Sequence, residues 1–191
     1  MRHNYIARLG NIVIRQIKED DIELLRNWRN DQDTTKFLRN IGYITEEMQR
    51  KWFESYLENE KDLVFAIQDV GELNRVVGSL SLYNWDKDQK TCEIGKIQIG
   101  DPAAHGKGIG RKTLVMAMKI AFQKLGIEKI IGAVHPDNVQ AYHNDMKIGF
   151  RVVGEAPSVV GGNELLLEIH EDDARTTNEY YDSIEVGQED Q

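Results

Sequence analysis

The order in which predicted strands and helices follow each other along the chain constrains its fold most strongly. Short alternating or apolar runs typical of β-strands come first, and they predict strands at 12–17, 63–70, 75–83 and 91–99. A glycine-rich loop then leads into an apolar stripe with helical spacing, which ends at Gly126. The remaining elements are expected to be a strand at 129–134, a helix at 138–148, and a closing strand pair at 150–154 and 165–169. Strands followed by two helical crossovers predict a mixed sheet.

Two further helices are expected between the first and second strands. Residues 19–30 carry apolar side chains at helical spacing. Thr45 is followed by two glutamates, which is the pattern of an N-cap with acids in the first turn, and it predicts a helix to about Asn59. The expected fold class is therefore α/β, with a mixed sheet of about seven strands and helices on both faces.

Composition limits the compartment and the number of domains. The single cysteine, Cys92, excludes an intrachain disulfide and fits a reducing environment. No apolar run reaches the ~20 residues needed to span a bilayer, and residues 1–5 lack the apolar core of a secretory signal. We therefore expect a cytoplasmic protein with no membrane partner. Its length fits one core, which we place in a single domain at 1–170.

The net charge of −8 is concentrated at one end of the chain. Residues 171–191 hold eight acidic side chains against Arg175, so the rest of the chain is close to neutral. A nearly neutral body argues against a nucleic-acid partner, which needs a basic face. The acidic C-terminal tail, 171–191, is expected to be a solvated, partly disordered extension, and a partner surface is the alternative.

The loop before the first crossover helix carries glycines at 106, 108 and 110. A backbone without side chains can direct several N–H groups to one point, where the helix dipole also favours negative charge. The loop therefore predicts a phosphate site, although an ordinary helix-entry turn would have the same glycines. A Walker A loop would need glycine where Arg111 stands, and the dinucleotide fingerprint would need one more residue between Gly108 and Gly110.

A motif other than the Walker A loop and the dinucleotide fingerprint matches four segments of the chain in order and spacing. These are Glu-Ile-Gly-Lys at 93–96, His-Gly-Lys-Gly-Ile-Gly at 105–110, Asn-Val-Gln-Ala at 138–141 and Lys-Ile-Gly-Phe at 147–150. Together they resemble the acyl-CoA signature of the GNAT superfamily of N-acetyltransferases. Within it they are most similar to the branch of RimJ and RimL, which acetylate the N-termini of ribosomal proteins. Trp-Arg-Asn at 28–30 and Trp-Phe at 52–53 also resemble members that acetylate nucleotide-linked amino sugars. The resemblance spans about 12–169 and is specific from 93 to 150.

The resemblance implies a GNAT-like fold with a mostly antiparallel sheet, and acetyl-CoA as co-substrate. In the family the pyrophosphate of CoA binds the amides of the glycine loop, which here would be those of His105, Gly106, Lys107, Gly108, Ile109 and Gly110. The pantetheine arm would pair with the backbone of the strand that holds Ile97 and Ile99. Asn138 matches a family asparagine on the pantetheine side, and it also fits a helix N-cap. Arg111 stands where a cation could meet the 3′-phosphate, or where it could simply be solvated.

Acetyl transfer to an amine needs a base, because an amine with a pKa of ~10 is almost wholly protonated at pH 7. Glu93 matches the acid of the family's Glu-Ile-Gly run and is the expected catalytic base. Its alternative is a structural carboxylate paired with a nearby basic group. A backbone N–H near Ile99 would serve as donor to the oxyanion.

The chain departs from the resemblance in the late helix. Many relatives place a tyrosine four residues before the final glycine, and here that position is Asp145. Tyr142, about one helical turn earlier, is the expected substitute near the leaving sulfur, with packing or surface exposure as its alternative. A thiolate leaves without much help from an acid, since thiols have a pKa of ~8.5. The departure keeps open a non-catalytic module that binds acyl-CoA.

The acceptor is expected to be a small amine, a nucleotide-linked amino sugar, with a protein N-terminus as the alternative. Arg29 would then bind substrate, since its guanidinium can pair with a diphosphate.

No metal is expected, because His105, His135 and His143 lack metal-ligand spacing. A homodimer is left open.

Overall fold

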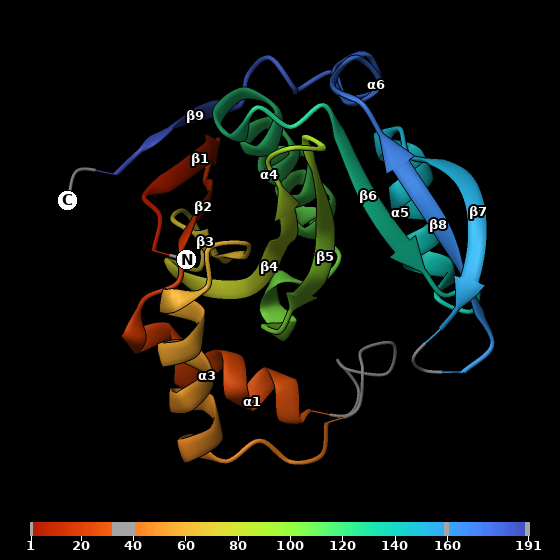
Figure 1. Cartoon of the computed structure of the whole chain (residues 1–191). Helices are drawn as coiled ribbons and strands as arrows, with labels where there is room; N and C mark the ends of the chain where they lie inside the picture. Colours follow the sequence, from red (N-terminus) through yellow and green to blue (C-terminus); the bar gives the residue numbers. More distant parts are fainter. Residues whose placement is uncertain (1, 32–40, 159–160, 190–191) are drawn as a thin grey trace.

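The computed structural model describes residues 2–31, 41–158 and 161–189, and within them all strands join one sheet. The strand order is β7-β8-β6-β5-β4-β3-β2-β1-β9 (Figure 1). The strands are β1 (Tyr5–Leu9), β2 (Ile12–Gln16), β3 (Leu63–Asp69), β4 (Arg75–Asp86), β5 (Thr91–Ile99), β6 (Lys129–Val134), β7 (Arg151–Pro157), β8 (Asn163–Ile169) and β9 (Glu185–Gln188). This confirms the mixed α/β class, but the nine strands exceed the expected seven by β1 and β9.

The helices begin and end close to the residues that local signals indicate. The helical segments are η1 (Glu19–Asp21), α1 (Ile22–Asn30), α3 (Glu46–Glu58), η2 (Pro102–Ala104), α4 (Ile109–Leu125), α5 (Val139–Ile148) and α6 (Glu171–Thr177). The side chain of Thr45 accepts a hydrogen bond from the amide of Met48, as an N-cap does. Gly126 ends α4 in the left-handed conformation, at a φ of 68°.

Helices cover both faces of the sheet, as the sequence predicts. Along β3 the side chains alternate: Leu63, Phe65 and Ile67 join the larger core under α4, whereas Val64 and Ala66 join a smaller core with α1 and α3. The α4 face and the α1/α3 face of the sheet are therefore two separate packing layers.

One neighbouring pair of strands is parallel within this sheet. All other neighbours for which a register is given are antiparallel, but β5 and β6 run in the same direction. The crossover between β5 and β6 is α4, and the crossover between β6 and β7 is α5. Because β5 and β6 are parallel, both helices start at the same end of the sheet, where the C-terminal ends of these strands lie.

The acidic C-terminal segment folds onto the sheet and α4, which corrects the expectation of a solvated extension for residues 171–189. α6 is followed by β9, and β9 pairs with β1 as an edge strand. Tyr181 and Ile184 are buried in the larger core. Lys119 of α4, itself buried, donates hydrogen bonds to the backbone carbonyls of these two residues at 2.8 and 2.9 Å. Asp172, Glu179, Asp182 and Glu185 of this segment remain exposed, and its few apolar side chains supply the burial that holds it.

Candidate active site

The sheet opens between β5 and β6. The two strands pair only over Thr91–Lys129, Cys92–Ile130 and Glu93–Ile131, after which β6 continues in register with β8. Figure 1 shows the ribbons of β5 and β6 separating from that point. Among the residues that the structure describes, no strand therefore lies beside the second half of β5 on the β6 side.

A bulge in β5 accounts for this separation. On β4 the step from Ser79 to Ser81 covers two residues, but on β5 the paired step from Gln98 to Gly95 covers three. Lys96, in the bulge, has a φ of 51°, a left-handed value that is uncommon for a residue with a side chain. A bulge bends its strand and increases the local twist, so β5 turns away from β6 after Glu93.

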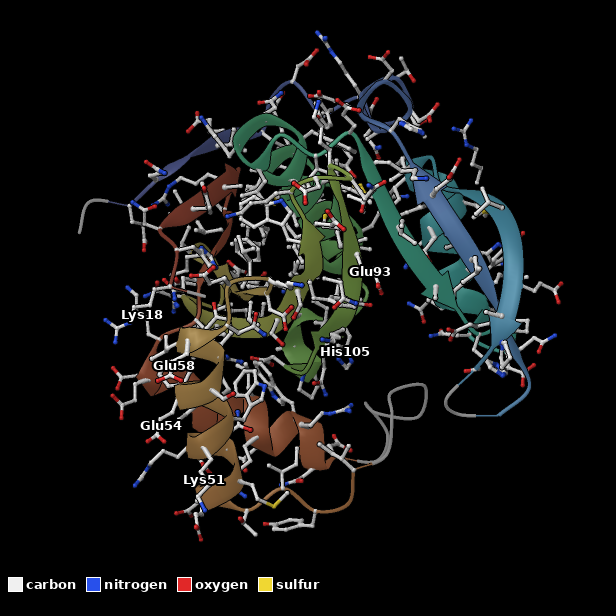
Figure 2. The ribbon with its side chains drawn as sticks, viewed as in Figure 1. Lys18, Lys51, Glu54, Glu58, Glu93 and His105 are labelled. Atoms are coloured by element: carbon white, nitrogen blue, oxygen red, sulfur yellow. The ribbon has the colours of Figure 1, made fainter. Side chains whose placement is uncertain are left out.

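Glu93 lies where the strands part, as Figure 2 shows. Its neighbours along β5, Cys92 and Ile94, point into the core under α4, so Glu93 faces the α1/α3 side of the sheet. The side-chain amide of Asn84 donates to its carboxylate at 2.7 Å. Among the described residues no basic side chain forms an ion pair with Glu93 (each ion pair found joins other groups).

Tyr83 is the cross-strand partner of Glu93. Burial raises the pKa of Tyr83 above its usual value, and the negative charges of Glu93, Glu164 and Asp62 raise it further. The ammonium of Lys96 lies 4.0 Å from the centre of the Tyr83 ring. Tyr83 and Glu93 are therefore subject to a mainly negative field from described carboxylates, with the Lys96 ammonium beside them.

The glycine loop forms an open N-terminus for α4. Gly106 and Gly108 have φ values of 75° and 70°, and Gly108 is the N-cap residue. Among the described residues no side chain caps this end of the helix, and its first turn carries no acid. The first backbone N–H groups of a helix have no intrahelical acceptor, and they attract anions. The predicted cradle residues His105, Gly106, Lys107, Gly108, Ile109 and Gly110 thus fit the phosphates of a nucleotide cofactor.

The loop is held against the end of β5. The ring Nε2 of His105 lies 2.8 Å from the carbonyl oxygen of Ile99. A Cβ added at Gly110 would lie 3.6 Å from Ile99 and 3.7 Å from Ile97, so the first turn of α4 rests directly on these two side chains. Lys107 pairs instead with Glu72, at 2.8 Å.

The backbone of Ile99 is directed to the open side of β5. The amide of Gly100 donates to the carbonyl of Val77 on the β4 side, at 3.0 Å. Amide directions alternate along a strand, so the N–H of Ile99 points away from β4. An N–H group that points this way could donate a hydrogen bond to a cofactor paired with β5, or to an oxyanion. The carbonyl of Ile99 is already engaged by His105.

Arg111 and Asn138 lie near the N-termini of the two crossover helices. Arg111 is half-buried in the first turn of α4, where it interacts with Tyr180 of the C-terminal segment. Asn138 is the N-cap of α5, since its side-chain oxygen accepts from the amide of Ala141 at 3.3 Å. The N-cap alternative for Asn138 is therefore confirmed, and a contact with a cofactor stays a prediction.

Tyr142 and Asp145 lie on the inner side of α5. Tyr142 is half-buried against the larger core. Asp145 is also half-buried, and burial raises its pKa to about 7. The sequence singles out position 145 only as a departure from a pattern, and the burial of its carboxyl emerges from the tertiary structure.

Arg29 lies on the last turn of α1, close to the end of β5. Its neighbour Trp28 accepts a hydrogen bond at its backbone carbonyl from Gln98 of β5, at 2.7 Å. A Cβ at Gly100 would clash with the Trp28 ring, so this ring covers Gly100. Arg29 is half-buried, and burial lowers its pKa. The Trp28 ring is thus packed against the protein's own backbone.

Three residues near the site lay outside the sequence prediction: Tyr83, Asn84 and Tyr180. Tyr83 and Asn84 reach Glu93 through the antiparallel register of β4 with β5, which a hairpin turn could have indicated. Tyr180 reaches Arg111 because the C-terminal segment packs against α4, and no local pattern signals that contact.

Among the residues that the structure places, no group of three or more histidine, cysteine or carboxylate side chains could hold a metal ion. Within the same residues no helix is long and apolar enough to cross a membrane.

Comparisons with known proteins point to one family. Residues 11–151 match the model of the acetyltransferase (GNAT) domain. An uncharacterized protein of Methanocaldococcus jannaschii is 31% identical over 76% of this chain, but the chain spans only 29% of that protein's length. An N-acetyltransferase 9-like protein of Nematostella vectensis is 22% identical, over 79% of this chain and 80% of its own length. Among solved structures, the spermidine N-acetyltransferase of Vibrio cholerae in complex with CoA and spermine superposes with a TM-score of 0.78 and 17% identity, covering 87% of this chain and 99% of its own.

Proposed function

The chain belongs to the acetyltransferase (GNAT) family, and from this premise we propose that it transfers the acetyl group of acetyl-CoA to a primary amine. The observation that carries the proposal is the junction of three features. In the described part of the chain, three features meet along β5: a helix N-terminus without a side-chain cap, a strand edge with no neighbouring strand, and the Glu93 carboxylate, which forms no ion pair. They supply a phosphate cradle, a backbone partner for an extended arm, and a base.

Acetyl-CoA would bind from the α4 face. The amides of residues 106–110 would hold its pyrophosphate, and Arg111 would meet the 3′-phosphate. The pantetheine arm would lie beside Ile97 and Ile99, with the amide of Ile99 as one of its hydrogen-bond donors. The absence of an acid in the first turn of α4 supports this orientation, because a carboxylate there would repel phosphate.

The amine would reach the thioester from the α1/α3 face, where Glu93 lies. Glu93 would accept its proton, directly or through a water, as the nitrogen attacks the carbonyl carbon. A backbone N–H at Ile99 would then stabilise the oxyanion of the tetrahedral intermediate. Attack is direct, with no covalent enzyme intermediate. Cys92 does not serve as a nucleophile, because burial raises the pKa of its thiol to about 12.

For the acceptor, the sequence favours a nucleotide-linked amino sugar, with Arg29 as the partner of the diphosphate. One observation favours a second candidate. The carboxylates of Asp62, Glu93 and Glu164 all act on Tyr83, so this face would attract an acceptor with more than one positive charge. A polyamine, of the kind named for the Vibrio cholerae structure, or a basic protein N-terminus has that chemistry. Membership of the RimJ/RimL branch, a cytoplasmic location and a homodimer likewise remain predictions.

The experiment is an acceptor panel. Release of free CoA thiol from acetyl-CoA would be followed with three acceptors: a nucleotide-linked amino sugar, spermidine, and a peptide with a free basic N-terminus. We expect thiol release with at least one of them, and mass spectrometry should show a single added acetyl group. Tight acetyl-CoA binding without transfer to any amine would favour the alternative, a non-catalytic acyl-CoA-binding module.

A further inference from the structure

Two strand residues beside Glu93 adopt a left-handed backbone conformation. Among the described non-glycine residues, a positive φ occurs at Asn74, Asn84, Lys90 and Lys96. Asn74 and Lys90 lie in the connections between strands, whereas Asn84 lies within β4 and Lys96 within β5, each at a φ of 51°. This conformation is uncommon in a strand, and proteins keep it mainly where the position of a side chain has a function.

The left-handed residue in β4 changes the face on which its side chain lies. Between two successive strand pairs β4 covers three residues where β5 covers two, so β4 is bulged at Asn84. Leu82 and Trp85, on either side of the bulge, both pack against the larger core. Side chains normally alternate along a strand, but here Tyr83 and Asn84 both lie on the face away from that core, where Glu93 also lies.

Both of these side chains donate a hydrogen bond to the Glu93 carboxylate. The Nδ2 of Asn84 lies 2.7 Å from Oε1 of Glu93. The hydroxyl of Tyr83 donates to the same carboxylate. The two oxygens of a carboxylate offer about four acceptor sites, so two donors fix its orientation and still leave sites for the proton of a substrate.

The Tyr83 ring is itself held in place by β5. A Cβ added at Gly95, two residues along the strand from Glu93, would lie 3.3 Å from the Tyr83 hydroxyl, so the ring crosses over Gly95. The ammonium of Lys96 lies 4.0 Å from the centre of the same ring, which is a cation–π contact. The bulged residues of β4 and β5 therefore both direct a side chain to the Tyr83–Glu93 pair.

The other charged groups around this cluster are negative. The carboxylate of Asp62 accepts a hydrogen bond from the backbone N–H of Asn84, at 3.3 Å, which helps to fix the bulge. Asp62 and Glu164 of β8 both act on Tyr83 through their charges. The groups that hold Glu93 are thus neutral donors, which fix the orientation of the carboxylate without cancelling its charge.

We propose that Asn84 and Tyr83 are positioning residues, which hold the Glu93 carboxylate in the orientation in which it accepts the proton of the acceptor amine. The inference rests on the proposed acetyl transfer with Glu93 as the base. Asn84 and Tyr83 move no proton themselves. The amine proton passes to Glu93 and then to solvent, while the C–S bond breaks and the CoA thiolate takes a proton from solvent. The rate depends on the two donors because a misplaced base reacts more slowly.

The first test is Asn84→Gly, measured with the acceptor that gives the highest rate in the panel. Glycine adopts a φ of 51° without strain, so this change removes the amide but keeps the bulge. We expect kcat to fall about 10-fold, because a hydrogen bond to a charged group is lost. The KM for acetyl-CoA should not change. Asn74→Gly is the matched control: Asn74 is exposed and has a φ of 46°, and this variant should keep wild-type kinetics and share the melting temperature of Asn84→Gly.

Two further variants separate orientation from folding. Asn84→Asp keeps the size of the side chain and tolerates the left-handed conformation, but it places a second carboxylate against Glu93. A like charge disfavours the ionised form, so the acid limb of kcat/KM should move to higher pH, and kcat at pH 7 should fall further than in Asn84→Gly. Tyr83→Phe loses only the hydroxyl and should lower kcat about as much as Asn84→Gly does.

A double variant tests whether Asn84 acts through Glu93. In a Glu93→Gln background, Asn84→Gly should lower kcat no further, because the carboxylate that Asn84 positions is already gone. If Asn84→Gly causes the same loss with and without Glu93, Asn84 acts on another group and the inference is overturned.

The outcomes separate this inference from the proposed function. If wild type acetylates an amine while Asn84→Gly and Tyr83→Phe keep its kcat and pH profile, the inference is overturned and the acetyltransferase proposal stands. A loss of kcat that is equally large in Asn74→Gly also overturns the inference. If wild type transfers no acetyl group to any amine, both proposals fail.

Discussion

Glu93 is hydrogen-bonded to Asn84 and Tyr83 of β4, and it has no ion-pair partner among the described residues. A structural carboxylate in a sheet is usually held by a cation, because an isolated charge in a partly buried position costs free energy. The arrangement at Glu93 instead leaves its charge available to an incoming ammonium group. The pairing alternative considered from the sequence is thus absent from the described part of the chain, and the catalytic role stays a prediction.

Glu93→Gln should lower kcat about 100-fold or more at pH 7, because the amide cannot accept the proton of the amine. The rate should recover partly towards pH 10, where more of the acceptor is already free amine. Initial rates of thiol release across this pH range would measure both effects. Glu54→Gln, on the exposed side of α3 (Figure 2), is the control and should match wild type throughout. A wild-type profile in Glu93→Gln would assign the base to another group or to water.

A substitution at Arg29 tests whether the acceptor carries a diphosphate. If the acceptor carries a diphosphate, Arg29→Ala should raise its KM about 10-fold or more, since a charge-assisted pair is lost. The Kd of acetyl-CoA should stay the same, because α1 lies on the opposite face of the sheet from α4. Steady-state kinetics and calorimetric titration would separate the two effects, with Arg50→Ala on the exposed surface of α3 as control. An unchanged KM, together with activity on spermidine or a peptide, would select a cationic acceptor.

At the scale of elements, the C-terminal segment is joined to α4 by a buried cation. Burial lowers the pKa of Lys119, yet its ammonium donates to the carbonyls of Tyr181 and Ile184. Tyr180, in the same segment, interacts with Arg111 in the first turn of α4. The segment that the sequence separates from the domain as a tail thus links the sheet edge at β1 to the proposed phosphate site.

Lys119→Met should destabilise the protein by about 2–4 kcal/mol, because two buried carbonyls lose a charged donor. The loss should free β9, so limited proteolysis should cut after residue 170 faster than in wild type. Urea denaturation followed by fluorescence would give the change in the free energy of unfolding. Lys124→Met, on the exposed side of α4, serves as the control. Equal stability and equal proteolysis of both variants would show that the Lys119 ammonium does not hold the C-terminal segment in place.

At the scale of the whole molecule, acetyl-CoA should stabilise the fold, since it binds only the folded state. At a ligand concentration of about 100 times Kd the gain is about 2.7 kcal/mol, which corresponds to a rise in melting temperature of about 5–10 °C for a chain of this size. Gly108→Asp should abolish the rise, because its carboxylate would stand beside the proposed pyrophosphate.

The control at that position is Gly108→Asn. Both variants place a side chain at a φ of 70°, where a Cβ meets no atom within 4 Å, and asparagine tolerates this conformation. They differ in charge, so the asparagine variant should keep most of the thermal shift. A full shift with Gly108→Asp would show that the loop does not hold phosphate.

Local signals in the sequence determined much of the architecture. β5 and β6 have the predicted bounds, and Thr45 and Gly126 end their helices as expected, because capping and side-chain periodicity depend on residues within one or two turns. The glycine loop was likewise visible, since it precedes a helical stripe at fixed spacing. The strand β1 was missed, although Gly10, with a φ of 56° between two short apolar runs, is a hairpin signal.

Only the tertiary structure decided how distant segments meet. The bulge at Lys96 is a difference in register between two strands, and β9 is a strand because β1 offers it an unpaired edge. The burial of Asp145 depends on what packs over α5, and the contact of Tyr180 with Arg111 depends on where the C-terminal segment crosses α4. Such contacts join residues far apart in the chain, and their free energies come from burial and pairing that no local pattern encodes. The sequence by itself therefore determined the elements and the phosphate loop, whereas the opening of the sheet and the groups that face it follow from packing.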